Sequence, residues 1–442
     1  MTKRWAVVAT MLALNVSALP VSGAAPGRGR FIVVLEDGAD SDAVAKDHAR
    51  RFETHTTFVY RHSLRGYAAA IPNARLDEVR ADWRVLYVAE DSEMKSFAPK
   101  PPPPPTPQPP QFLSDAVDRI DGDLSSAVSG DGSGSVGINV AVFEGGVDFD
   151  HPDLNVVGGI NCSSGRRFDV PDSHGTFVAG LIGARDNSFG VVGVAPGARI
   201  WSVRVFNKAI ASRSTIICGI EFVTASRMDA DPTNDIAVAN LSLGGPGEDD
   251  GTCGRTRRDP LHQAICASVD AGVTYVVAAG NEGSDLQGTA PAAYDEVLTV
   301  TAIRDFDGIP GGLGFPSTPC QTQGDFVLND DSRAGFSNYA TLPADHAHTV
   351  AAPGFCVDST LPGGGYGVGS GTSYATPLTA GTVALCIASG YCAGLNPAQI
   401  IQKIVADAAV YNITNPDYGF TGDPLLPVPD RYYGFLIRAA LY

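Results

Sequence analysis

Apolar positions between residues 31 and 90 follow two spacings that alternate along the chain. Short β-branched and aromatic runs predict strands over 31–35, 57–60, 67–71 and 85–89. Apolar residues at helical spacing predict helices over 42–52, with Ser41 placed to cap it, and over 74–83. The order strand, helix, strand, strand, helix, strand is typical of a small ferredoxin-like α+β domain.

Farther along the chain, glycine-bounded apolar runs alternate with helical patterns. Strands are expected over 139–143, 200–205, 236–240, 275–279 and 297–302. Helices are expected near 174–183, 213–227, 259–271 and 372–389. Continuous β-branched runs indicate strands that are buried on both faces, and their alternation with helices predicts a parallel α/β sheet. In such sheets, functional residues gather at the carboxyl ends of the strands.

The N-terminus has the layout of a secretory signal peptide. Lys3 and Arg4 precede an apolar run over 5–19, and small residues follow over 21–25. This arrangement predicts removal of residues 1–24 and a secreted, extracellular protein. A membrane anchor is the alternative, but the run is short and Asn15 interrupts it. No other stretch has 18 consecutive apolar residues, so we expect no membrane-spanning segment.

Nine of the twelve residues from 99 to 110 are proline. Proline has a fixed φ and lacks an N–H donor, so this stretch is predicted to be an extended spacer. It divides the chain into a small domain at 25–98, a linker at 99–111 and a large domain at 112–442. A ligand for a proline-recognition module is the alternative interpretation of the same residues.

Composition excludes two classes of protein. Of the 442 residues, 44% are apolar and 18% are charged, which excludes a disordered or fibrous chain. The formal net charge is −17. An acidic body of this kind repels phosphate backbones, so nucleic acid is not expected as a partner.

All eight cysteines lie after residue 160. An even count in an exported protein predicts disulfides, and Cys386 with Cys392, which are close in sequence, is the best-supported pair. The lack of a CxxC pair argues against structural zinc. Asn161 and Asn412 lie in glycan acceptor patterns, which matter only in a eukaryotic host. Asn240 lies in such a pattern too, but it is expected to be shielded from glycosylation.

Four polar residues stand where predicted strands end or helices begin. Ser373 opens an apolar helix, where free N–H groups can stabilise an oxyanion. His174 opens a glycine-flanked helix and is placed to act as a base. Asn281 follows a buried strand and can donate to developing negative charge, while Glu144 ends another strand as a carboxylate able to orient a histidine. Taken singly, each also fits a capping, surface or turn residue.

Together these segments resemble the subtilisin-like serine proteases over about residues 112–410. The resemblance is carried by GTSYATP around Ser373, by DSHGTFVAG around His174 and by the order acid, His, Asn, Ser. The segments over 193–197 and 241–245 match as well. The resemblance implies a three-layer α/β fold with a mostly parallel central sheet, serine endopeptidase activity and no cofactor for catalysis. Ser373 would be the nucleophile, His174 the general base and then the general acid, and Asn281 with the Ser373 N–H the oxyanion hole.

The resemblance also implies contacts with a protein or peptide substrate. Ser242, Leu243 and Gly244 would pair with the substrate backbone as an added strand. The aligned pocket walls are small or apolar and carry no evident acid, and they consist of Ser242, Leu243, Gly244, Ala279 and Gly280. This favours an apolar or aromatic side chain before the scissile bond. A monomer is expected.

The small N-terminal domain resembles the inhibitory propeptide of the same family, which covers the active site of its own chain. Residues 87–91 fit the end of that domain, and residues 118–120 resemble the start of a mature enzyme. Maturation is therefore expected to cut within 92–111. The side before Pro99 is favoured because proline resists most such cleavages.

One departure from the family pattern concerns the acid. The family normally has aspartate followed by threonine or serine and glycine, whereas this chain has Glu144, Gly145 and Gly146. Glutamate is longer by about 1.5 Å, and Gly145 has no hydroxyl to brace it. A substitute acid at Asp148 or Asp150 is disfavoured because that loop does not face the histidine in the family.

Two other functions remain as alternatives. The first is a weak or inactive pseudoprotease that acts as a binding protein, because the altered acid could misalign the catalytic residues. The second is a lipase or esterase, which requires a GxSxG elbow. Ala375 stands where that motif needs its second glycine, so the second alternative is disfavoured.

The resemblance implies a structural calcium site in the loop over 184–191. Its ligands would be the side chains of Asp153 and Asn187 and the carbonyl oxygens of Arg185, Phe189 and Val191. Oxygen ligands from a loop suit a hard cation such as calcium. A further ligand from the new N-terminus is not identified, and an ordinary polar surface loop is the alternative.

Overall fold

The computed structural model describes residues 27–97, 108–165, 167–315 and 329–442. The expected signal peptide and most of the proline-rich linker lie outside the described residues.

The N-terminal domain has the predicted order of elements. These are β1 (Arg28–Leu35), α1 (Ser41–Phe52), β2 (His55–Tyr60), β3 (Gly66–Pro72), α2 (Leu76–Arg80) and β4 (Val85–Glu90). Its antiparallel sheet has the order β2-β3-β1-β4, and α1 and α2 pack on one face. The ferredoxin-like arrangement is therefore confirmed.

Two local predictions in this domain are wrong. The N-cap of α1 is Asp40, whose side chain accepts a hydrogen bond from Ala43 N, and Ser41 is already helical. The second helix is shorter than predicted, because residues 73–75 form a 3-10 turn and α2 ends at Arg80. Asp82 accepts the Arg84 N–H at 3.1 Å, and such a local side-chain bond to the backbone competes with the helix.

The large domain is built on a nine-stranded sheet that is parallel except where β15 pairs with β14. Its order is β19-β16-β14-β12-β10-β6-β8-β7. The predicted strands are all present, within two residues of their predicted ends, as β6 (Asn139–Glu144), β8 (Arg199–Arg204), β10 (Ile236–Leu241), β12 (Thr274–Ala278) and β14 (Leu298–Arg304). The sheet also contains β7 (Val156–Asn161), β15 (Ser332–Arg333), β16 (Thr349–Phe355) and β19 (Phe435–Leu436).

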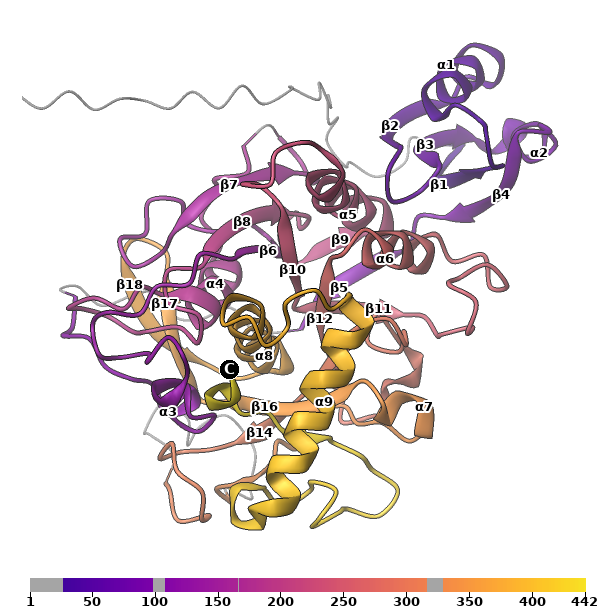
Figure 1. Ribbon diagram of the computed structural model, residues 1–442. Helices are drawn as coiled ribbons and strands as arrows, with labels where there is room; N and C mark the ends of the chain where they lie inside the picture. The colour runs from indigo at the N-terminus through magenta and orange to yellow at the C-terminus, as the bar shows by residue number, and fades with distance from the viewer. Residues whose placement is uncertain (1–26, 98–107, 166, 316–328) are drawn as a thin grey trace, which may run out of the picture.

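Helices cover both faces of this sheet and make three layers (Figure 1). One face carries α4 (Ser173–Gly183) and α8 (Thr372–Ala388), and the other carries α5 (Arg213–Met228) and α6 (Pro260–Asp270). Strand β6 shows why the sequence of such a strand is continuously apolar. Val140 and Val142 belong to the core under α4 and α8, whereas Ala141 and Phe143 belong to the core under α5 and α6.

The remaining elements are short or lie at the edges of the large domain. They are β5 (Glu93–Ser96), α3 (Asp115–Asp118), β9 (Ile210–Ser212), β11 (Leu243–Pro246), β13 (Thr289–Ala290), α7 (Pro343–His346), β17 (Val357–Leu361), β18 (Gly365–Gly369) and α9 (Pro397–Thr414). None of the helices formed by the described residues combines the length and the apolar character that a membrane span requires.

The second face of the N-terminal sheet packs on α5 and α6 of the large domain (Figure 1). Phe58 and Tyr60 join the same apolar cluster as Ile216 and Ile220, and Tyr60 Oη donates to Ser214 O at 3.0 Å. Beside this apolar contact, the Glu221 carboxylate of α5 receives a set of N–H and O–H donors from residues 61–63. The two domains are thus joined by both apolar packing and hydrogen bonds.

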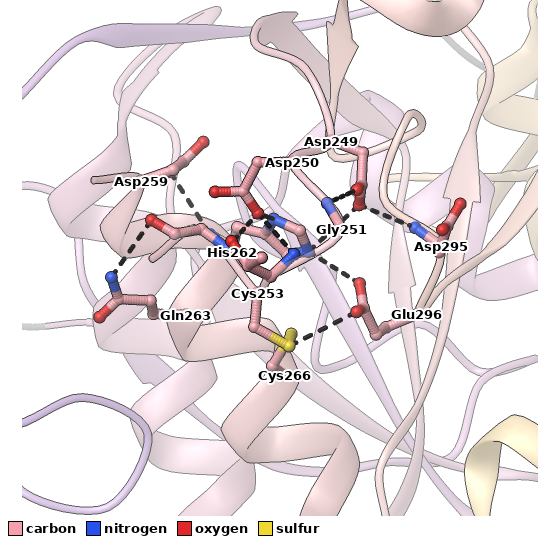
Figure 2. Close-up of a disulfide and its surroundings, with 12 residues drawn as sticks. Asp249, Asp250, Gly251, Cys253, Asp259, His262, Gln263, Cys266, Asp295 and Glu296 are labelled. Atoms are coloured by element: carbon pink, nitrogen blue, oxygen red, sulfur yellow. Dashed lines mark hydrogen bonds and ion pairs between the residues drawn. A yellow bond between two sulfur atoms is a disulfide. The ribbon is translucent and has the colours of Figure 1, made fainter. Parts of the chain in front are cut away.

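Disulfides join Cys162 to Cys218, Cys253 to Cys266 and Cys386 to Cys392, and no described cysteine is free. The predicted pair Cys386–Cys392 is therefore confirmed. Figure 2 shows the Cys253–Cys266 bridge, which ties the loop after β11 to α6. In the same place the buried His262 ring lies between Asp249 and Glu296, with its Nε2 2.7 Å from Glu296 Oε2. These contacts fix the loop that leaves β11.

Candidate active site

Glu144 and His174 meet at the carboxyl edge of the central sheet. Glu144 is the last residue of β6, and His174 is the second residue of α4. Glu144 Oε2 lies 2.8 Å from His174 Nδ1, and both residues are buried. Burial works to lower the pKa of His174, but the charge of Glu144 and its hydrogen bond raise this pKa overall. The longer acid therefore reaches the imidazole in spite of its changed length.

Ser373 is the second residue of α8, a position that exposes free N–H groups of the first helical turn. Its Oγ donates to Ser242 O at 3.3 Å, and Ser242 Oγ donates to Ser373 O at 2.9 Å. His174 Nε2 is buried and, within the described part of the chain, has no hydrogen-bond partner. Catalytic hydrogen bonds are often long or misaligned before a substrate is fully engaged.

Asn281 lies in the turn that follows β12. Its Oδ1 accepts from Thr372 N at 2.9 Å and from Thr372 Oγ1 at 2.8 Å, which fixes the orientation of the amide. The Nδ2 group then points away from Thr372 and donates to the carbonyl oxygen of Phe97. An oriented amide that donates to a peptide carbonyl can stabilise negative charge on that oxygen.

The segment that ends at Phe97 lies between β11 and β9 as an extra strand. β5 pairs antiparallel with β11, with Leu243 opposite Ser96 and Gly244 opposite Lys95, and its other edge pairs with β9. Ser96 Oγ lies 3.2 Å from His174 Nδ1. Leu243 and Gly244 thus pair with a strand of the same chain, and the pairing of residues 242–244 with a substrate stays a prediction.

Two glycines of β11 make room for side chains of this segment. A Cβ added at Gly244 would collide with the Phe97 ring, and one added at Gly245 would lie 2.7 Å from Met94 Sδ. Gly244 is therefore one of the predicted pocket residues that the structure places against an aromatic side chain.

Two further predicted pocket residues, Ala279 and Gly280, follow β12. Ala279 packs in a small buried cluster with Leu286 and Ala340. Gly280 has a φ of 109° and closely approaches Asn338 Nδ2, so a side chain there would be strained. Gly280 also leads directly into Asn281, and Gly280 N donates to Thr372 Oγ1 at 3.2 Å. These two residues therefore shape the turn that carries the amide.

The alternative acids stay away from the histidine. Asp148 Oδ2 accepts from Gly363 N at 2.7 Å, and Asp148 Oδ1 accepts from Asp150 N at 3.2 Å. The Asp148 carboxylate is thus engaged with the backbone, and the charges that raise the pKa of His174 are those of Glu144 and Asp172.

Two of the predicted calcium ligands, Asp153 and Asn187, contact each other through their side chains. Asp153 is fully buried, and its two carboxylate oxygens accept from Asn187 Nδ2 at 2.7 Å and from Tyr366 Oη at 3.2 Å. Burial raises the pKa of Asp153 to about 6. Among the described residues, no group donates a hydrogen bond to the carbonyl oxygens of Arg185, Phe189 or Val191. Oxygen atoms that lack donors are available to a cation.

Gln111 is a contact of this loop that the sequence did not identify. Its Oε1 accepts from Asn187 N at 2.5 Å, and its Nε2 donates to Asp186 Oδ1 at 2.6 Å. The residues around it pair with the same loop through Pro110 and Phe189. The end of the predicted linker therefore packs on the large domain.

Phe97 and Glu221 are the other residues that sequence reasoning missed. An aromatic residue inside the expected cleavage region 92–111, combined with the predicted apolar pocket, is a signal that points to Phe97. Glu221 carries no such signal, because a lone glutamate on a helix usually faces solvent.

Comparisons with known proteins agree with this geometry. The sequence profile of the subtilase family, a family of peptidases, matches residues 135–423. Subtilisin E of Bacillus subtilis is 31% identical over 391 residues, which cover 86% of each chain. Subtilisin of Bacillus pumilus is 36% identical over 256 residues, 57% of this chain and 76% of the relative. An alkaline protease of Alkalihalobacillus alcalophilus is 31% identical over 312 residues, 70% of this chain and 66% of the relative. A strand-ending acid, a helix-opening histidine and a helix-opening serine thus lie within a matched region that covers most of the large domain, and the chain belongs to the subtilase family.

Proposed function

We propose that the chain is a secreted serine endopeptidase, made as a zymogen, that hydrolyses peptide bonds through a Glu144–His174–Ser373 triad. Family membership supports the serine endopeptidase activity. The observation that carries the rest of the proposal is that Asn281 donates to the Phe97 carbonyl while β5 pairs with β11. A peptide strand with one carbonyl held by an amide is the posture of a bound substrate.

In this proposal Ser373 Oγ attacks the carbonyl carbon of the scissile bond and passes its proton to His174 Nε2. Asn281 Nδ2 and the Ser373 N–H stabilise the oxyanion that forms. His174 then gives the proton to the leaving amine, and an acyl-enzyme remains until water hydrolyses it. Glu144 keeps the Nδ1 proton in place and stabilises the imidazolium, which its 2.8 Å contact supports.

The N-terminal domain serves in this proposal as the chain's own inhibitor. It packs on α5 and α6 through an apolar face, and the segment that follows it pairs with β11 as far as Ser96. Because that edge of β11 is the one proposed to bind substrate, its pairing within the chain would exclude other substrates. Maturation would cut after Phe97, which lies inside the region expected from the sequence and before Pro99.

A fluorophosphonate probe tests the assignment of the nucleophile. Mature protein should be labelled, whereas the Ser373→Ala and His174→Ala variants should not be. Ser389→Ala, which changes the C-cap residue of the same helix, is the matched control and should be labelled like the unsubstituted protein. Labelling of Ser373→Ala, or no labelling of mature protein freed of its N-terminal domain, would contradict the proposal.

A second candidate function is a binding protein on the same fold. The observation that favours it is the Ser373 Oγ bond to Ser242 O, since this hydroxyl is then turned towards a carbonyl oxygen rather than towards a base. In that case purified large domain would bind peptides with aromatic residues yet remain unlabelled by the probe and release no product.

We also propose a structural calcium site formed by Asp153, Asn187 and the carbonyl oxygens of Arg185, Phe189 and Val191. Its support is the buried Asp153 carboxylate, which accepts hydrogen bonds from Asn187 Nδ2, Val191 N and Tyr366 Oη and has no cationic side chain hydrogen-bonded to it within the described part of the chain. Calcium would neutralise this carboxylate and hold the loop against the start of the large domain.

A further inference from the structure

Asp172 links the helix that carries His174 to the strand that carries Glu144. It is the N-cap of α4, and its Oδ1 accepts from His174 N at 3.0 Å and from Gly175 N at 3.1 Å. A carboxylate at this position satisfies free N–H groups and complements the positive end of the helix. Asp172 therefore sets the first turn of α4, in which His174 lies.

The other oxygen of the same carboxyl group faces Gly145. A Cβ added at Gly145 would lie 2.8 Å from Asp172 Cγ and 2.9 Å from Asp172 Oδ2, closer than side chains can approach. Where the family usually has a hydroxyl residue after the acid, this chain therefore has the carboxyl group of Asp172. The exchange explains why glycine follows Glu144.

The backbone around Glu144 is held by close approach rather than by a hydroxyl. A Cβ added at Gly175 would lie 2.8 Å from Glu144 Cβ, so α4 begins directly against the end of β6. Only one oxygen of Glu144 is hydrogen-bonded to a side chain. Within the described part of the chain, Oε1 is buried without a hydrogen-bond partner. The distance between Glu144 and His174 thus depends on where the first turn of α4 sits.

The charges around His174 are few. Glu144 of β6 and Asp172 raise its pKa, against the effect of burial. The other groups that face its ring are the Tyr374 phenol of α8, with ring centroids 5.4 Å apart, and the Ser96 hydroxyl of β5. Arg204 of β8 holds the backbone beside this contact, because its Nε donates to Gly145 O at 3.0 Å. Burial lowers the pKa of Arg204, against the effect of the Asp172 charge.

We propose that Asp172 is a positioning residue of the catalytic site, which fits the site to glutamate by locking α4 against Gly145 and which adds a second negative charge beside His174. This inference rests on the proposed function. It identifies the Gly145–Asp172 pair, rather than a hydroxyl, as the brace of the acid. The pair predicts that a larger residue at position 145 is tolerated only when the side chain at position 172 becomes smaller.

Two variants of the full chain, compared after maturation, test the two halves of the proposal. Asp172→Asn keeps an oxygen acceptor for the helix but loses the charge. The acid limb of kcat/KM should move to lower pH by roughly 0.5–1 unit with KM unchanged. Asp169→Asn, which removes a nearby charge that pairs with Arg167 instead, is the matched control and should leave the limb in place.

Gly145→Ser should lower kcat by about 100-fold, because Asp172 occupies the space that the new side chain needs. Adding Asp172→Ser to this variant shortens the side chain at position 172 but still caps the helix. The kcat of the double variant should therefore be at least about tenfold higher than that of Gly145→Ser alone. An unmoved acid limb in Asp172→Asn, or additive losses in the double variant, would overturn the proposal.

The failure of this inference and the failure of the proposed function are distinguishable. If the unsubstituted protein has no hydrolytic activity, the proposed function fails. The titration of His174 can then still be followed by NMR of its ring protons in the Ser373→Ala chain. The same downward shift with Asp172→Asn supports the positioning role, and an unchanged titration overturns it.

Discussion

The side-chain amide of Asn281 donates a hydrogen bond to the main-chain carbonyl oxygen of Phe97. The two residues lie far apart in the sequence and meet because β5 pairs with β11. A donor aimed at one carbonyl oxygen of an extended strand singles out the peptide bond that follows it.

We therefore predict that maturation cuts between Phe97 and Ala98. N-terminal sequencing of the secreted product should begin at Ala98, and the Ser373→Ala chain should remain uncut. Phe97→Asp should slow the cleavage, because the charged side chain would lose its hydration where it packs against Gly244. A first residue elsewhere in the mature chain would contradict this assignment of the cleavage site.

A second prediction concerns the choice of side chain before the scissile bond. Gly244→Ala places a methyl group where the Phe97 ring lies, so kcat/KM for peptides with Phe at that position should fall by about 10- to 200-fold. Peptides with Ala there should be affected less. A panel of otherwise identical peptides with Phe, Ala or Lys at this position measures the change. Equal losses for Phe and Ala would show that the ring does not use this surface.

The elements that carry the candidate site could be predicted because each is a continuous apolar run that ends at a polar residue. Val140 to Phe143 alternate between two cores, which is why the run lacks polar positions, and Glu144 is the first acid after it. Ser373 and His174 stand at helix starts, which the sequence indicates through the glycines that flank them. The parallel sheet then brings these ends to one edge without further information.

The contacts that hold the site together could not be predicted in the same way. In β5 only Met94 is buried, and the segment forms a strand because β9 and β11 lie on either side of it. The sequence around Asp172 indicates a helix cap, but nothing local indicates that its second carboxylate oxygen meets Gly145. Both contacts join segments that are distant in sequence, so they depend on the assembled fold.

A third prediction follows from the 2.8 Å contact between Glu144 and His174. Because the glutamate already reaches the ring, Glu144→Asp should open this contact by about 1.5 Å and lower kcat by about 100-fold. Glu144→Gln should cost about 10⁴-fold, since an amide favours the wrong tautomer of the histidine. Asp150→Asn is the control and should change little. Higher turnover in Glu144→Asp would show that the acid is misaligned in the natural protein.

The calcium proposal gives a fourth prediction. Removing calcium from mature protein with a chelator should lower Tm, and adding it back should restore Tm by mass action. Asp153→Asn removes the buried carboxylate and should abolish this response, while Asp169→Asn should keep it. Because a cation favours the ionised carboxylate, the calcium effect should weaken as pH falls towards 6, the raised pKa of Asp153. A response that persists in Asp153→Asn would place the ion elsewhere.

The last prediction concerns the release of the N-terminal domain. Glu221 accepts hydrogen bonds from the backbone N–H groups of Arg61, His62 and Ser63, and His62 Nδ1 lies 2.7 Å from Glu221 Oε1. Hydrogen bonds to a charged group each contribute about 1.5–3 kcal/mol when they are well shielded. Glu221→Gln should therefore raise the inhibition constant of the cleaved domain by tenfold or more. Asp229→Asn, at the other end of α5, is the matched control.

The same contact makes release depend on pH with a definite sign. The hydrogen bond to Glu221 raises the pKa of His62 in the bound state, against the effect of partial burial. Its contribution to binding is therefore fully present below the ordinary histidine pKa of about 6.5 and is lost as pH rises through the raised value. The domain should leave faster at pH 8.5 than at pH 5.5. In His62→Gln this pH difference should shrink, because the contribution of His62 is lost while the other groups that titrate at the interface are unchanged. A pH dependence of equal size in both proteins would assign the effect to another group.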